Sequence, residues 1–379
     1  MVSKRSKKTH PLSLRHSVTG AVLGVFALVV FGYIGFGPLL FGNAVAFDRA
    51  GGASATTSVP VQKPKVPALD RAAYDLKMQQ LANYPVEPVA TSTATSTAST
   101  TPAKAKPWPV KNAPYPKAGA LLPFNRIVAY YGNFYSKGMG VLGQYPEDIM
   151  LDKLRAAVHE WELADPSTPV IPAIHYIVST AQESAGASGM YSALMPDSQV
   201  DKAIEIAAKV HGIVLIDFQV GKSTLQAQLP QYEKYLAMPN VHLGIDPEFS
   251  MKTGARPGTV IGSFDAEDIN YAANYLAKLV REHDLPPKIL VIHRFTLDMV
   301  TGYKRITPLP EVQIVMDMDG WGSPQRKQNT YYHVVSAEPV QFTGFKLFYK
   351  NDLKEVPPRM MTPAEVLKLI PQPIYIQYQ

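Results

Sequence analysis

The stretch VHLGIDPE, residues 241–248, is an apolar run that ends on two carboxylates. Apart from His242, the run before Asp246 is apolar, as is typical of a strand buried on both faces of a parallel sheet. Residues two apart on an extended chain point to the same side, so the strand predicts that Asp246 and Glu248 share a face. The stretch therefore predicts a buried parallel sheet and a polar site at the carboxyl end of its strands.

Seven further stretches read as strands of the same kind. The eight strand candidates begin at Arg126, Val170, Gly212, Val241, Lys288, Val312, Gly344 and Pro373. Amphipathic helix patterns fill most of the gaps, at residues 146–163, 197–210, 223–237, 265–283 and 362–370. Eight alternating units in about 255 residues predict a (β/α)₈ TIM barrel over residues 121–379. An open doubly wound sheet is the alternative, because strand order cannot be read from this pattern.

Capping signals place several helix boundaries. Thr362 and Glu365 form a capping-box pattern, and Asp197 is predicted to cap the helix that follows it. Pro230 is predicted to interrupt the helix of residues 223–237. The gap after the fifth strand has room for only a short helix, at residues 297–303.

The first 120 residues are predicted to target the chain to the membrane rather than to form a folded domain. Residues 1–16 are a basic tail, and residues 17–42 hold no charged side chain over a length that can span a bilayer. The positive-inside rule then predicts a single-pass signal anchor in the cell membrane with an extracytoplasmic C-terminal domain. Cleavage near Ala46, which would give a secreted protein, is the alternative. Residues 43–120 form a linker rich in Pro, Thr, Ser and Ala, with a short helix predicted at 68–82.

Composition excludes several functions. The chain has no cysteine, which excludes disulfides, thiol catalysis and cysteine metal sites. Five of the six net positive charges lie in the basic tail, so the barrel has no charge excess for nucleic acid. The tetrapeptide GKST at residues 221–224 lacks the earlier glycine of a phosphate-binding loop. We therefore expect no nucleic acid and no cofactor.

Polar side chains end most of the predicted strands, where a barrel places its active site. Acids and aromatic rings around one mouth suit a carbohydrate, because carboxylates move protons and rings stack on sugars. The predicted catalytic residues are Glu248, Asp246, Asp319, Asp317 and Asp217. The predicted substrate-binding residues are Tyr131, His175, Tyr176, His293, Arg294, Trp321, Lys346 and Tyr378.

Glu248 is predicted to be the general acid, with the charge of Asp246 raising its pKa. Asp319, Asp317 or Asp217 would supply the second function. The structural alternative is that these acids pair with Lys346 and Arg294 inside the barrel. The alternative of a metal site would use His175, Asp217, Asp246 and His293. No H-x-H or H-E-x-x-H spacing occurs, so no metal is predicted.

Two resemblances bear on these predictions. The segment GIDPEF is similar to the end of the fourth-strand motif D-x-x-D-x-D-x-E of family-18 chitinases, with Asp246 and Glu248 at its last two acids. Val241 and Gly244 stand where the earlier acids belong. The series LIDFQVG, GIDPEF, VIHRF, MDMDGWG, GFKLFY and MTPAEVL resembles a set of exported or lipid-anchored bacterial proteins with a glycoside hydrolase-like barrel. That resemblance implies the barrel and export, and no reaction.

The sequence thus predicts a membrane-anchored, extracytoplasmic glycoside hydrolase-like enzyme. Its substrate would be a cell-envelope or extracellular polysaccharide, and its chemistry carboxylate acid/base catalysis. The alternative function is a catalytically silent barrel that binds a glycan or a partner at the cell surface. The missing acids of the chitinase-like motif favour that alternative.

Overall fold

The computed structural model describes residues 67–85 and 106–379 of the chain. The predicted basic tail, the predicted transmembrane segment and the larger part of the predicted linker lie outside these residues. Within the described part, no helix combines the length and the apolar character that a bilayer crossing requires.

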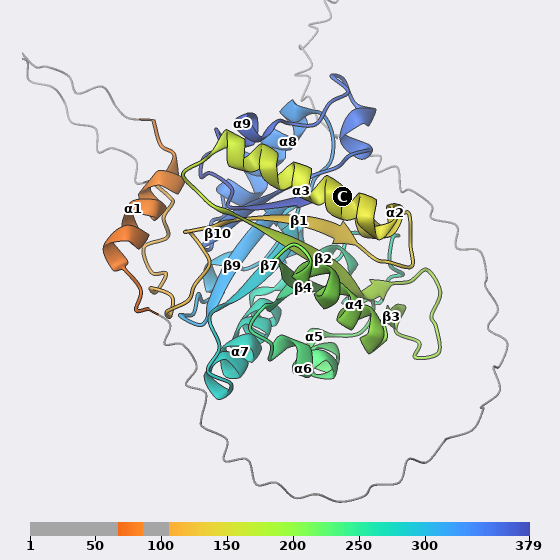
Figure 1. Ribbon diagram of the computed structural model, residues 1–379. Coiled ribbons are helices and arrows are strands. Elements are labelled where there is room, and N and C mark those ends of the chain that lie inside the picture. Colours follow the sequence, from red (N-terminus) through yellow and green to blue (C-terminus); the bar gives the residue numbers. More distant parts are fainter. Residues whose placement is uncertain (1–66, 86–105) are drawn as a thin grey trace, which may run out of the picture. The chain divides into compact units, whose positions relative to one another are not determined.

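A closed ring of parallel strands forms the centre of the described chain (Figure 1). The first strand pairs with both the second and the last, so the sheet has no open edge and the predicted barrel is confirmed. In order around the ring, the eight strands of the described residues are β1 (Arg126–Gly132), β2 (Val170–Ala181), β4 (Ile213–Phe218), β5 (Val241–Ile245), β7 (Lys288–Arg294), β9 (Val312–Met318), β10 (Phe342–Leu347) and β11 (Tyr375–Tyr378).

Short strands lie outside this ring. β3 (Ser192–Leu194) pairs antiparallel with the end of β2, in the connection that follows that strand. β6 (Phe264–Asp265) and β8 (Val300–Thr301) pair with each other. The short helix predicted for residues 297–303 is wrong, because this segment divides into a 3₁₀ turn at Leu297–Met299, β8, and a second turn at Tyr303–Arg305.

Helices cover the outside of the ring (Figure 1). Their apolar faces and the outward-facing strand residues form one large buried cluster. The helices are α2 (Val141–Gln144), α3 (Glu147–Ala164), α4 (Asp197–Ala208), α5 (Leu225–Gln228), α6 (Glu233–Leu236), α7 (Ala266–Glu282), α8 (Pro324–Thr330), which continues into a π-helical turn at Tyr331–Ser336, and α9 (Pro363–Val366).

The predicted helix boundaries can be compared with these bounds. The capping box of Thr362 and Glu365 is confirmed at the start of α9. Pro230 lies in a 3₁₀ turn, Leu229–Tyr232, that separates α5 from α6, so the predicted interruption is confirmed. The prediction for Asp197 is wrong, since Pro196 is the N-cap and Asp197 is the first helical residue. An acid in the first turn is still favourable there, because it faces the positive end of the helix dipole.

Helix α1 (Arg71–Ala82) and the segment from residue 106 close the N-terminal end of the barrel. Tyr74, Met78 and Leu81 of α1 are buried together with Trp108, whose Nε1 donates a hydrogen bond to the carbonyl oxygen of Gln341 at 2.7 Å. These side chains meet the inward-facing apolar residues at the start of the strands. We call this group the apolar floor; its strand members include Ile127, Ala129, Ala173, Ile213, Leu215, Ile289, Val291 and Val315.

Candidate active site

Inward-facing side chains change character half-way along the barrel. On β4, Ile213 and Leu215 belong to the apolar floor, and the next inward residue is Asp217. On β7, Val291 is followed in the same way by His293. Because inward residues recur every second position, each strand presents its polar residue at the C-terminal end. We call the group they form the polar cluster: Tyr131, His175, Asp217, Asp246, His293, Asp317, Asp319, Lys346 and Gln377.

Two glycines make room for the polar cluster. Gly244 lies opposite Asp217 in the β4–β5 register, and a Cβ atom there would lie 2.3 Å from Asp217 Oδ1 and from His175 Nε2. Gly344 lies opposite Asp317, and a Cβ atom there would lie 2.6 Å from Asp317 Oδ1. The space that these two strands leave empty is therefore filled by carboxylates and imidazoles of their neighbours.

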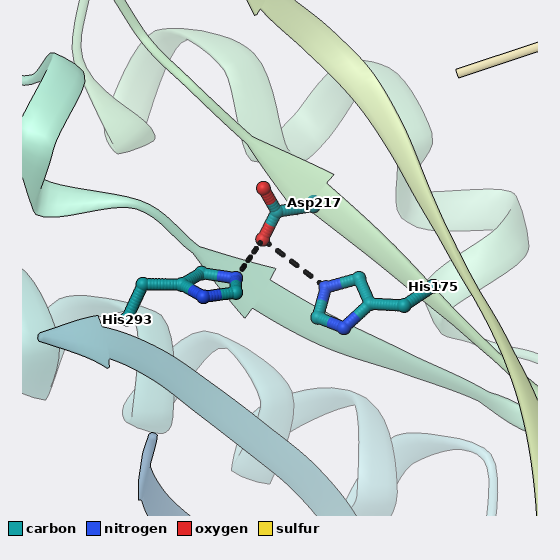
Figure 2. A group of neighbouring side chains, drawn as sticks. All are labelled: His175, Asp217 and His293. Carbon is teal, nitrogen blue, oxygen red and sulfur yellow. Dashed lines mark hydrogen bonds and ion pairs between the residues drawn. The ribbon is translucent and has the colours of Figure 1, made fainter. Parts of the chain in front are cut away.

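Asp217 is the centre of the cluster (Figure 2). Its Oδ1 lies 3.2 Å from His175 Nε2 and 3.3 Å from His293 Nε2, and its Oδ2 accepts a hydrogen bond from the Tyr131 hydroxyl at 3.1 Å. Burial alone would raise the pKa of this carboxyl. The charge of His293 and the hydrogen bonds from both histidines outweigh burial and hold the pKa well below its usual range. Asp217 is thus an ionised carboxylate that no solvent reaches.

His175 is the neutral histidine of the pair. Burial lowers its pKa to about 4, against the opposing effect of Asp217. Its Nδ1 faces the Tyr375 hydroxyl at 2.6 Å and the Gln377 side-chain amide at 2.9 Å. A neutral ring carries one proton. That proton lies on Nε2 when the ring donates to Asp217.

His293 is the charged histidine. Burial would lower its pKa, but the surrounding carboxylates, above all Asp217, raise it well above the usual value. Its Nδ1 lies 3.2 Å from Asp319 Oδ2 and 3.6 Å from Asp317 Oδ2. The imidazolium therefore bridges carboxylates from β4 and from the end of β9.

Asp319 and Lys346 form a nearly buried ion pair. Lys346 Nζ lies 2.9 Å from Asp319 Oδ1 and 4.1 Å from the centroid of the Tyr131 ring. Burial would raise the pKa of Asp319, but Lys346 and His293 together lower it. Asp319 is consequently ionised, and with 9% of its surface exposed it lies nearer to solvent than Asp217 does.

Asp246 and Glu248 do not continue β5 as an extended pair. β5 ends at Ile245, and a 3₁₀ turn at Pro247–Phe249 follows. Asp246 caps this turn, since its Oδ1 accepts a hydrogen bond from the Glu248 backbone N–H at 3.1 Å. The extended backbone on which the same-face prediction rested is therefore wrong at these two residues. The cause is local: proline suits the first position of a turn, and aspartate suits the cap.

The two acids nevertheless lie close enough to influence each other. Burial, with the charges of Asp217 and Asp319, raises the pKa of Asp246 to about 7 despite the opposing charge of His293. Burial, with the charges of Asp246 and Asp319, raises the pKa of Glu248 to about 8. Glu248 is half-buried, and no hydrogen bond from the described residues reaches its carboxyl. At neutral pH it therefore holds a proton at the edge of the cluster.

Several predicted binding residues point out of the barrel. Arg294 donates hydrogen bonds to the carbonyl oxygens of Thr296, Leu297 and Val300 and pairs with Glu338, so it fastens the loop after β7. Tyr176 stacks on Phe134 beneath the helices. Tyr378 accepts a hydrogen bond from Trp161 Nε1 at 2.9 Å. Each is adjacent in sequence to an inward residue, and neighbours on a strand face opposite sides.

Trp321 lies in the connection after β9 and is half-buried. The guanidinium of Arg326 lies 5.4 Å from its ring centroid and Lys354 Nζ lies 5.6 Å away. It is thus held near the barrel mouth without belonging to the polar cluster.

Three members of the site were not among the predicted residues. Gln219 reaches both the Tyr131 hydroxyl and Asp246 Oδ2, at 3.4 and 3.5 Å. Tyr375 and Gln377 orient His175. The alternation rule selects all three residues. Gln219 lies two residues after the inward-facing Asp217, and Gln377 lies two residues before Gln379. Tyr375 lies two residues before Gln377 and so faces the same side.

Comparison with known proteins gives little beyond this geometry. No family model matches the chain, and no curated protein matches it. Among solved structures, Thermotoga maritima Cel5A in complex with cellobiose is 13% identical, with 66% of this chain and 88% of that chain covered and a TM-score of 0.35. A GH5-4 broad-specificity endoglucanase from Clostridium longisporum is 9% identical, with coverage of 59% and 75% and a TM-score of 0.32.

A hyperthermophilic endo-beta-1,4-glucanase in complex with substrate is also similar, at 9% identity, with 68% of this chain and 89% of that chain covered and a TM-score of 0.34. At such identities and TM-scores, neither residue roles nor substrates can be transferred. The roles of the residues at this mouth must therefore come from their own contacts and charges.

Proposed function

We propose that the barrel is a glycoside hydrolase-like enzyme that acts on a cell-envelope or extracellular polysaccharide by carboxylate acid/base catalysis. The supporting observation is a pair of carboxyls at the barrel mouth, one with negatively charged neighbours and the other with positively charged neighbours. Glu248 follows β5 among other acids, whereas Asp319 follows β9 between Lys346 and His293. Two carboxyls held in opposite protonation states are what glycoside hydrolysis requires.

Glu248 is the general acid in this proposal. Its carboxyl is half-buried and carries a raised pKa, so it is protonated at neutral pH. No side chain of the described residues donates to it, which leaves it available to the oxygen of a glycosidic bond. A proton delivered to that oxygen makes the departing sugar a better leaving group.

Asp319 is the second carboxyl. Lys346 holds it ionised, and a carboxylate can stabilise positive charge that develops on the sugar ring or can activate water. Asp246, also with a raised pKa, tunes Glu248 through its position at the cap of the same turn. Asp217 and Asp317 are fully buried and serve this site by positioning His293.

Binding without catalysis is the second candidate function. It is favoured by the depth of the cluster, because Asp246 and Asp319 expose only 2% and 9% of their surface. A glycan at the mouth would touch Glu248 and the half-buried Trp321 before it reached them. In either case we propose that residues 17–42 anchor the chain in the membrane, since a basic tail precedes this uncharged segment.

Hydrolysis and binding of a glycan and muropeptide panel by the full chain in detergent test the proposal. Glu248→Gln removes the acidic proton with little change in shape and is expected to lower kcat/KM by about 100-fold or more, with binding retained. Asp319→Asn should also lower it. Glu205→Gln, on the exposed face of α4, is the matched control and should have no effect.

Two outcomes decide against catalysis. Unchanged hydrolysis in Glu248→Gln would remove the general-acid role. Wild-type binding of a glycan with no cleavage of any panel member would establish the silent barrel instead.

A further inference from the structure

The deepest part of the polar cluster has the composition of a metal site. His175 Nε2, Asp217 Oδ1 and His293 Nε2 come from β2, β4 and β7, and all three atoms lie within 4.8 Å of one another (Figure 2). All three residues are buried. We propose that these side chains bind one divalent transition-metal ion, and that Zn²⁺ is the ion their donor set suits. Two imidazoles and a carboxylate are common ligands of zinc.

The distances agree with a shared ion. Ligand atoms about 2.1 Å from a zinc ion, at tetrahedral or octahedral angles, are separated by about 3.0 to 3.5 Å. Asp217 Oδ1 lies 3.2 Å from His175 Nε2 and 3.3 Å from His293 Nε2. The two imidazole rings are 5.5 Å apart between centroids, and both present Nε2 to the same carboxylate oxygen. Only small movements are needed to admit an ion among the three atoms.

The outer atoms of His175 and Asp217 have the partners that metal ligands use. The Nδ1 of His175 faces the Tyr375 hydroxyl and the Gln377 amide. Gln377 Oε1 is buried without a partner among the described residues, and a rotated amide would let it accept the Nδ1 proton. The second oxygen of Asp217 accepts a hydrogen bond from Tyr131. Such outer partners fix the orientation of metal ligands.

The outer atom of His293 faces carboxylates. Its Nδ1 lies 3.2 Å from Asp319 Oδ2 and 3.6 Å from Asp317 Oδ2. A carboxylate behind a histidine ligand is a recurring arrangement in zinc sites. With an ion bound, the ring would keep its proton on Nδ1, donate it to these acids, and use Nε2 as ligand.

Charge gives an independent reason to expect a cation here. The carboxyls of Asp217, Asp317 and Asp319 all face His293, and Lys346 is the lysine that pairs with one of them. Both carboxylate oxygens of Asp317 are buried and make no hydrogen bond within the described residues, and one of them is aimed at His293. A buried carboxylate without hydrogen bonds is costly, and a divalent ion would stabilise it.

A proton on His293 is the competing occupant. As an imidazolium, His293 bridges Asp217 and Asp319 and supplies one positive charge at the same place. The ion would displace that proton, since a histidine ligand must offer a lone pair. Because its three donors are buried, the ion acts as a structural cation that ties β2, β4 and β7 together. The site does not depend on the proposed hydrolysis.

The test uses the full chain, expressed without a polyhistidine tag and treated with a chelator. Addition of Zn²⁺ should load about one ion per chain by elemental analysis, raise the melting temperature, and release protons to an unbuffered solution. Co²⁺ should give visible absorption bands of a site with nitrogen and oxygen ligands. Ion binding is measured separately from hydrolysis, so failure of one proposal leaves the other intact.

Variants locate the ion. His175→Gln and Asp217→Asn should each weaken Zn²⁺ binding by about 100-fold or more, since each removes a ligand. His159→Gln, on a histidine with 67% of its side chain exposed, is the control and should bind as the wild type does. If the ligand variants do not fold, uptake, proton release and the Co²⁺ spectrum of the wild type decide. A chain that takes up no Zn²⁺, Co²⁺, Mn²⁺ or Fe²⁺ overturns the proposal, as does unchanged binding in folded ligand variants.

Discussion

The apolar floor and the polar cluster occupy the two ends of one barrel interior. They are built from the same strands with the same inward parity, yet Leu215 is followed inward by Asp217, and Val291 by His293. The floor buries apolar surface against α1 and Trp108, which stabilises the fold in proportion to the area removed from water. The cluster buries charges, whose desolvation opposes folding unless every charge has a partner.

The difference shows how the barrel can bury charged residues at one end: the other end supplies the stability. The floor supplies stability through many weak contacts, none of which depends on protonation. The cluster depends on a small number of strong, interdependent contacts, centred on Asp217 and His293. Changes in the floor should therefore alter stability alone, whereas changes in the cluster should alter pH dependence and ligand binding as well.

Removal of Trp108 should have the largest effect on stability. Its ring is 2% exposed and its Nε1 bonds the carbonyl of Gln341, so Trp108→Ala leaves both a cavity and an unpaired acceptor. We expect a loss of about 3 to 5 kcal/mol in the free energy of unfolding, measured by denaturant titration. Trp321→Ala, at the half-buried tryptophan near the mouth, is the control and should cost much less. Equal losses would mean that the floor does not dominate stability.

A methyl group added inside the polar cluster should have an intermediate effect on the free energy of unfolding. In Gly244→Ala the new Cβ would lie 2.3 Å from Asp217 Oδ1 and His175 Nε2, so the strands or these side chains must shift. We expect a loss of about 1 to 3 kcal/mol on denaturant titration, together with weaker ion binding if the proposed metal site exists. Gly320→Ala, where the nearest atom would be 3.2 Å away, is the matched control. Full stability of the Gly244 variant would show that the cluster is not tightly packed.

The sequence was sufficient to predict the barrel because the strand-and-helix pattern is repeated along the chain. Eight buried runs with helical patterns between them predicted the ring, and the strands formed where the runs lay. It was not sufficient for the buried face of α1, because the apolar side chain of Leu76 does not lie on that face and is 61% exposed. Tyr74 and Met78 are buried instead, and only contact with the strand ends selects that face.

The site residues were predictable where a strand-end residue lay an even number of positions from an inward-facing residue on the same strand. Residues such as Asp217, His293 and Lys346 were chosen at strand ends and do face inward. Arg294, Tyr176 and Tyr378 come from the same strand ends but have the opposite parity, so they face outward, next to inward neighbours. The turn at Glu248 could not come from an alternation rule, because a cap and a proline end the strand there.

Substitution of Glu248 should have the smallest effect on stability of these three changes, and the size of that effect should depend on pH. The carboxyl has a pKa of about 8 in the folded chain, against 4.5 as its ordinary value, so between these values the folded state binds more protons than the unfolded state. Stability should therefore fall as pH rises through that window. Glu248→Gln removes this loss, because the amide does not ionise.

The variant should match the wild type near pH 4.5 and exceed it near pH 9, by about 1 kcal/mol or about 2 to 4 °C in melting temperature. Asp246, with a pKa raised to about 7, leaves a residual slope of the same sign in the variant. Glu205→Gln, exposed on α4, should run parallel to the wild type at every pH. A Glu248→Gln curve parallel to the wild type would mean that Glu248 ionises normally, and the cluster would then end at Asp246 rather than reach the mouth.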